Sequence, residues 1–174
     1  MSQYNIIAES QEYTVVAEYD HVATPAESYQ SESDLEKEFI RLLGEQGYEY
    51  FPIHTEADLI KNLRSQLEKL NSYHFTDSEW ERFFNECIAN KNDDIVAKTA
   101  KIQDDYIQVL KRDTGESRNI KLIDKDNIHN NFVQVINQYV EEGGNYDTRY
   151  DVSILVNGLP LVHIELKRRG VQLK

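Results

Sequence analysis

Three runs in the first half of the chain place apolar residues at helical spacing. The first begins at Ser31, has apolar positions 35, 39, 42 and 43, and has a natural stop at Gly47. The second carries leucines at 59, 63, 67 and 70 and ends near Asn71. The third opens with the capping-box pattern Thr76–Glu79 and continues with an apolar, mostly aromatic stripe: Trp80, Phe83, Phe84, Cys87 and Ile88. We expect three amphipathic helices, with this stripe buried in the core.

Beyond about residue 102 the apolar spacing changes to that of strands. Segments 106–110 and 119–123 flank a polar turn at 113–116, and 132–140 is rich in β-branched residues. The first 20 residues are expected to be irregular, apart from a short strand at 14–19. With no internal repeat or Pro/Gly-rich linker, residues 1–174 are predicted to form one α/β domain, a central sheet flanked by helices.

A hairpin near the end of the chain carries the most specific pattern. Asn157-Gly158 separates two aliphatic runs, 151–156 and 161–167, which is a strong short-range hairpin signal. Alternation places Val162, Ile164 and Leu166 on one face of the second strand, and His163, Glu165 and Lys167 on the other. An acid and a lysine have no packing reason to end such a strand. We therefore expect each to be paired or bound to a metal.

The register of this hairpin decides whether Asp151 can meet Glu165. The two residues oppose each other only where paired residue numbers add to 316, whereas a two-residue Asn157-Gly158 loop gives 315. We therefore predict a three-residue loop at 157–159, with Pro160 starting the return strand, or an equivalent bulge.

Two carboxylates and a lysine in this arrangement are suited to phosphodiester hydrolysis. Asp151 and Glu165 would bracket a divalent cation, with Mg²⁺ the usual ion, and the main-chain carbonyl of Leu166 is a plausible further ligand. Such an ion polarises the phosphate and lowers the pKa of an attacking water. Lys167 would orient that water and stabilise the negative charge that develops. His163 shares this face, and a polar rim position is the favoured interpretation for it.

Composition and charge narrow the choice of compartment and partners. The chain has 40% hydrophobic and 29% charged residues, no apolar run long enough for a membrane span and no signal-peptide pattern. One cysteine, Cys87, excludes an internal disulfide, so we expect a cytoplasmic protein with no membrane association. The net charge is −12, but residues 145–174 hold five basic and three acidic groups, a balance of +2. We expect any DNA contact at that end or through another subunit.

The residues from Arg149 to Lys167, with Asn157-Gly158-Leu159-Pro160 followed by Ile164-Glu165-Leu166-Lys167, closely resemble the nuclease signature of type I restriction enzymes. That signature belongs to the N-terminal domain of their restriction (motor) subunit. Segments 28–36, 77–80 and 139–144 are also similar to this family, so the resemblance covers nearly the whole chain.

The resemblance implies a restriction-endonuclease-like PD-(D/E)XK fold, with Asp151, Glu165 and Lys167 matching the motif. Tyr150 stands where the motif has proline, a position that tolerates variation. In such folds the first helix often adds an acid to the metal site. With Leu35, Phe39 and Leu42 taken as the inward face, Glu32 is the candidate and Glu36 lies at the edge of that face. Mg²⁺ is the implied cofactor, with Mn²⁺ as a substitute.

The resemblance also implies partners and a larger enzyme. Family members cleave double-stranded DNA without reading its sequence in this domain, and work with methyltransferase and specificity subunits. They use ATP in a translocase that follows the nuclease, and this chain lacks a phosphate-binding loop and the Gln-x-x-x-Tyr helix, as expected of a fragment. Two alternatives stay open: a repair or junction-resolving nuclease of the same fold, and a non-catalytic assembly module with a relic site.

Overall fold

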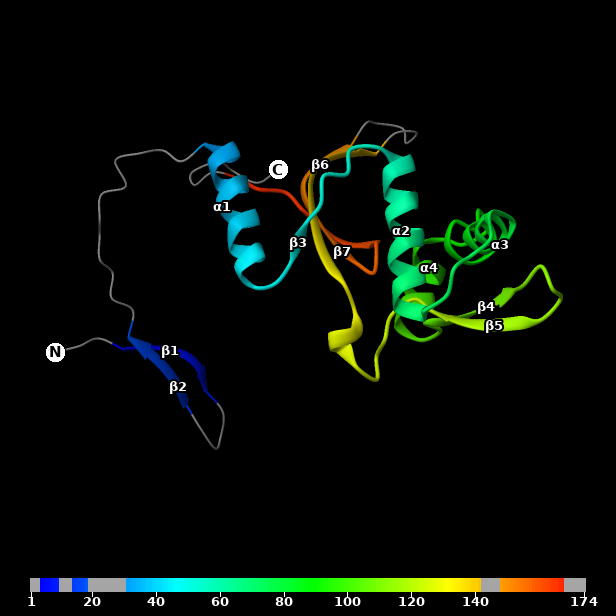
Figure 1. Ribbon diagram of the computed structural model, residues 1–174. Coiled ribbons are helices and arrows are strands. Elements are labelled where there is room, and N and C mark those ends of the chain that lie inside the picture. The colour runs from blue at the N-terminus through cyan, green and yellow to red at the C-terminus, as the bar shows by residue number, and fades with distance from the viewer. Residues whose placement is uncertain (1–3, 10–13, 19–30, 142–147, 168–174) are drawn as a thin grey trace. The chain divides into compact units, whose positions relative to one another are not determined.

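A computed structural model describes residues 4–9, 14–18, 31–141 and 148–167 (Figure 1). The chain divides into two units, 1–30 and 31–174, each of which is described by itself. The expectation that residues 1–174 form one domain stays a prediction. Among the helices of the described ranges, none is long and apolar enough to cross a membrane.

The first unit contains an antiparallel hairpin of β1 (Tyr4–Glu9) and β2 (Thr14–Glu18). The strand predicted at 14–19 is confirmed as β2, but the expectation of irregular structure before it is wrong. A register shift between Ile6 and Ala8 interrupts the two-residue alternation of β1. That interruption explains why the strand pattern is not visible in the sequence.

The predicted helices are present and begin at side-chain caps. Ser31 caps α1 (Glu32–Glu45), Thr55 caps α2 (Glu56–Asn71), and Thr76 with Glu79 forms the full capping box of α3 (Asp77–Phe83), which continues as a π-helical turn, Phe84–Ile88. A further helix, α4 (Ile95–Gln103), was not predicted. Its first two residues, Ile95 and Val96, are exposed and β-branched, so they favour neither the helix nor a buried face.

A four-stranded mixed sheet forms the centre of the second unit. Its order is β3-β6-β7-β8, with β3 parallel to β6 and the other two pairs antiparallel. The strands are β3 (Glu49–Tyr50), β6 (Val133–Glu141), β7 (Thr148–Val156) and β8 (Leu159–Ile164). Figure 1 shows the sheet between α1 and α2. The predicted α/β class with a mixed sheet flanked by helices is confirmed.

The two helices cover opposite faces of this sheet because neighbouring strand residues alternate in direction. Val135 of β6 packs with Leu43 of α1, whereas the next residue, Ile136, lies in a cluster that Leu59 of α2 joins. On the α2 side, Asn62 also donates a hydrogen bond to Gln134 at 2.9 Å in a buried position.

The inward face of α1 differs from the predicted one. Leu42 is 41% exposed, while Phe39, Ile40 and Leu43 contact the sheet. The buried face of α1 is thus turned from the predicted positions 35, 39 and 42 toward positions 40 and 43. Glu36, one turn before Ile40, consequently faces the sheet and not the edge of the helix.

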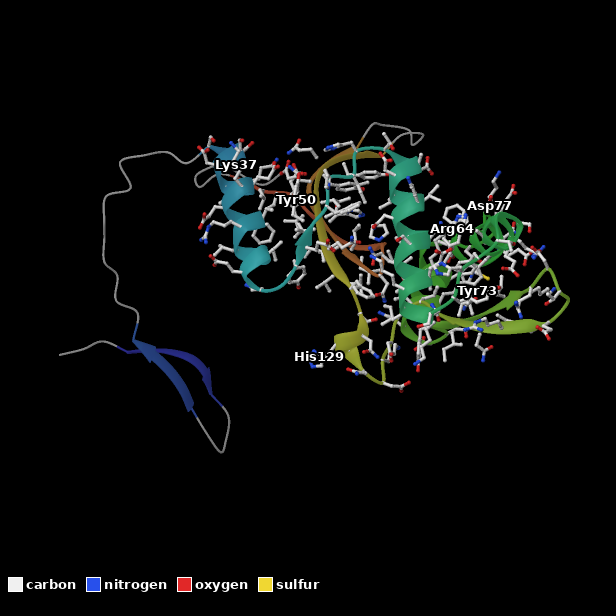
Figure 2. The ribbon with its side chains drawn as sticks, viewed as in Figure 1. Lys37, Tyr50, Arg64, Tyr73, Asp77 and His129 are labelled. Atoms are coloured by element: carbon white, nitrogen blue, oxygen red, sulfur yellow. The ribbon has the colours of Figure 1, made fainter. Side chains whose placement is uncertain are left out.

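A second hairpin packs on α2 and α3 apart from the central sheet. It consists of β4 (Ile107–Lys111) and β5 (Ser117–Lys121), close to the two predicted strands, and a 3₁₀ turn (Ile128–Asn130) precedes β6. Leu110 and Ile120 bury their side chains in the largest core, where Trp80 and Phe83 confirm the predicted aromatic stripe. Arg64 of α2 bonds Asp77 of α3 at the rim of this core (Figure 2).

Candidate active site

The site is built on the β7–β8 hairpin, whose turn is tightly held. Asn157 and Gly158 both have positive φ, 51° and 82°, the requirement of a type I′ turn. Asn157 is fully buried, and its side chain accepts from the Phe132 N–H and donates to the Leu122 carbonyl and to Asn131. The turn is therefore anchored to the segment that leads into β6.

The hairpin register agrees with only one of the two predicted forms. Val156 pairs with Leu159, so the loop has two residues and the three-residue loop is wrong. A bulge then shifts the register between Leu155 and Ile154, so that Ser153 pairs with His163, numbers that add to 316. The equivalent bulge is confirmed, and its extra residue is Leu161 on the return strand.

The second strand ends earlier than predicted. β8 stops at Ile164, so Glu165 and Lys167 follow the strand instead of lying on it. The reason is local: the Leu166 N–H donates to Asp151 Oδ2 at 2.7 Å, and a side-chain carboxylate thus takes the place of a strand carbonyl. Asp151 is thereby fixed directly beside the Glu165–Lys167 segment.

Glu165 and Lys167 form an ion pair at this end of the hairpin. Lys167 Nζ lies 2.5 Å from Glu165 Oε1, and both side chains are partly exposed. This hydrogen bond is the main reason that the pKa of Lys167 is raised above its usual value, and the charges of Glu165, Glu32 and Asp151 raise it further. The structure thus brings the three predicted residues together around a lysine that stays cationic at neutral pH.

Helix α1 brings two acids toward the same end of the sheet. Glu32 lies in its first turn and is exposed, within electrostatic reach of Lys167. Glu36 binds the sheet directly: Asn137 donates to its Oε1 at 2.6 Å, and Gln138 donates to its Oε2. The Gln138 backbone has a φ of 54°, and the pairs Asn137–Val152 and Tyr139–Tyr150 of the β6–β7 ladder stand on either side of Gln138 and Asp151.

A stacked aromatic pair, which the sequence did not reveal, joins β7 to β8 at the residue before Asp151. The rings of Tyr150 and His163 lie 4.0 Å apart between centroids at 18°. His163 Nδ1 is also hydrogen-bonded to the Ser153 hydroxyl at 2.8 Å. These residues line a cavity of about 120 Å³ that Leu59, Ile136, Tyr139 and Pro160 complete. One sequence feature could have pointed to this pair: Ser153 is a polar residue within an aliphatic strand, and it stands opposite His163 in the shifted register.

The donor atoms suit a hard divalent cation. Asp151, Glu165 and the Leu166 carbonyl offer oxygen ligands, the type that Mg²⁺ prefers. A carboxylate has about four lone-pair positions, so the hydrogen bond from the Leu166 N–H leaves other lone pairs of Asp151 available to a metal ion. Within the described ranges, however, no group of three or more His, Cys, Asp or Glu side chains is placed to hold a metal. The metal assignments, Glu32 included, stay predictions.

A mixed sheet flanked by helices, with two acids and a lysine at the end of its β7–β8 hairpin, has the architecture of the restriction-endonuclease-like fold class. Within that class, the chain belongs to the family described as the type I restriction enzyme R protein N terminus, whose model matches residues 29–174.

Curated relatives agree with this family. The chain is 46% identical over 169 residues to the type I restriction enzyme EcoprrI endonuclease subunit of Escherichia coli, covering 97% of this chain and 54% of that one. It is 39% identical over 150 residues to the type I restriction enzyme SsaAORF53P endonuclease subunit of Staphylococcus saprophyticus, covering 83% of this chain and 16% of that one. The SauCOLORF180P endonuclease subunit of Staphylococcus aureus is 37% identical over 151 residues, which cover 84% of this chain and 16% of that one. The chain thus spans about half or less of these relatives.

Proposed function

We propose that this chain is the DNA-cleaving domain of a type I restriction endonuclease subunit and hydrolyses phosphodiester bonds in double-stranded DNA with the help of a divalent metal. The observation that carries the proposal is the Asp151–Leu166 hydrogen bond, which sets one acid of the motif beside the other acid and its lysine. The endonuclease names of the relatives support the same activity.

Each residue has a role that follows from its position. Asp151, Glu165 and the Leu166 carbonyl would hold Mg²⁺, or Mn²⁺ in its place. When bound, such an ion polarises a phosphate oxygen and lowers the pKa of a coordinated water. Lys167 is a cation at neutral pH, and Glu165 raises its pKa further, so it would stabilise the negative charge that builds on the phosphate.

Contacts with the DNA backbone would dominate substrate binding. The balance of +2 in residues 145–174 of the sequence, against −12 overall, supports phosphate contacts through this part of the chain. Sequence recognition would come from a specificity subunit and methylation from a methyltransferase subunit. ATP would act in a translocase part of the working enzyme. These partners, the use of ATP and a cytoplasmic location are proposed from the family resemblance.

Plasmid cleavage tests the proposed activity. The native chain is expected to nick or linearise supercoiled DNA with Mg²⁺ or Mn²⁺, and Lys167→Ala to cut about 100-fold more slowly, since it loses one charge-stabilising donor. Lys98→Ala, an exposed lysine of α4, is the matched control and is expected to cut like the native chain. Equal cutting by Lys167→Ala and the native chain would contradict the assigned role.

A second candidate is a non-catalytic assembly module with a relic site. This candidate predicts that the native chain cuts no DNA and binds no Mg²⁺ or Mn²⁺, either alone or with duplex DNA present. Metal binding that requires Asp151 would exclude it.

A further inference from the structure

We propose that His163 and Ser153 are positioning residues that hold the catalytic end of the β7–β8 hairpin in the register it needs. This inference rests on the proposed function for its consequence, because it concerns how Asp151 is set against Glu165. It does not assign either residue a contact with substrate or metal. Its structural part can be tested without any activity.

The first step of the argument is that the hairpin contains two registers. The turn imposes pairs whose numbers add to 315, as in Val156–Leu159. Beyond the bulge the pairs add to 316, as in Val152–Ile164. If the turn register continued through the strand, Asp151 would face Ile164 and the acids would separate. The site therefore depends on the bulge staying at Leu161.

The second step is that the side chains of Ser153 and His163 meet only in the shifted register. They are paired directly across the strands, and their side chains are hydrogen-bonded at 2.8 Å. In the turn register Ser153 would oppose Val162, and His163 would turn to the other face of the sheet. The Ser153 side chain is buried, with 1% of the residue exposed, so loss of this partner would leave a polar group inside the sheet.

The third step is that His163 also contacts the residue next to Asp151. Its ring stacks on Tyr150, with 4.0 Å between ring centroids. His163 therefore joins two points of β7, one on each side of Asp151. A cross-strand pair and an aromatic stack each favour a single arrangement of the strands. Together they select the register in which Asp151 reaches the Leu166 N–H.

Amide hydrogen exchange at Leu166 measures this contact directly, because its N–H donates to Asp151. His163→Ala and Ser153→Ala are each expected to speed exchange of that amide, and the double variant to add little to either single change. Val162→Ala, on the same strand and 45% exposed, is the control and is expected to leave Leu166 exchange near native.

Mn²⁺ titration of the same variants tests the consequence. Removing a residue that orients a ligand typically weakens metal binding by about 10- to 100-fold. We expect that loss in His163→Ala and Ser153→Ala, while Val162→Ala binds like the native chain even if its melting temperature falls. A purely structural role would lower the melting temperature of all three without separating their affinities.

The outcomes distinguish this inference from the proposed function. Native-like Leu166 exchange in both His163→Ala and Ser153→Ala would overturn the positioning role, whatever the metal does. Faster Leu166 exchange in a chain that binds no Mn²⁺ would support the register lock and count against the metal-dependent function. Faster exchange together with weaker Mn²⁺ binding would support both.

Discussion

The hairpins β4–β5 and β7–β8 differ in the regularity of their strand pairing. β4 and β5 pair regularly from Ile107–Lys121 to Lys111–Ser117, and their inward residues join the largest core. β7 and β8 change register within six residues, and their far end carries charged side chains. A regular ladder suits packing, whereas a bulge re-aims side chains. The comparison teaches that the irregularity of β7–β8 is what brings the acids together.

The largest expected effect comes from the glycine in the β7–β8 turn. A Cβ at Gly158 would stand 2.6 Å from the Leu63 Cα of α2, and the backbone φ is 82°. Both the turn strain and a backbone clash oppose a side chain there, so Gly158→Ala should lower the free energy of unfolding by about 3 kcal/mol or more. Chemical denaturation of the purified variant measures this loss.

Gly115 in the β4–β5 turn provides the matched comparison. It has a similar φ, 88°, but nothing lies within 4 Å of a Cβ built there. Gly115→Ala should therefore cost only the left-handed strain, about 1 kcal/mol. A loss equal to that of Gly158→Ala would show that the contact of the β7–β8 turn with α2 contributes nothing.

A smaller effect, dependent on pH, is expected at Asp113 in the β4–β5 hairpin. Its carboxylate accepts hydrogen bonds from Ser78, Thr76 and Arg82, which lower its pKa from 3.8 to about 2. Because the folded pKa is depressed, the stabilisation is complete above about pH 4 and is lost as the pH falls toward 2. Asp113→Asn should be less stable than the native chain at pH 7, and the difference should shrink over that range.

Thermal denaturation at several pH values checks this prediction. Asp126→Asn, in the loop that follows β5, serves as the control, because Asp126 is exposed and pairs with Lys121 at 3.4 Å. A stability difference for Asp113→Asn that stays constant from pH 7 to pH 2 would contradict the assigned hydrogen bonds.

The elements that local signals define were predictable from the sequence. Apolar spacing indicated the helix start at Ser31, the capping box marked the start at Thr76, and Asn157-Gly158 marked the turn. The need for a register shift, by a three-residue loop or by a bulge, followed from requiring Asp151 and Glu165 to meet, and the structure has the bulge. These features depend on residues close in sequence or on the strict two-residue period of strands.

The remaining features depend on contacts that no local pattern encodes. The rotation of α1 that turns Glu36 toward Asn137 is set by packing on the sheet, and the sequence indicated a different face. The early end of β8 arises because Asp151 takes the Leu166 N–H. The stack of Tyr150 on His163 crosses two strands and also required the observed register.

Calorimetric titration with Mn²⁺ tests the central claim most directly, on the native chain, Asp151→Ala and the control Asp104→Ala, an exposed acid at the end of α4. The account predicts that the native chain and Asp104→Ala bind the ion and that Asp151→Ala does not. Absence of binding in the native chain, or equal binding in Asp151→Ala, would contradict a metal site at the end of the β7–β8 hairpin.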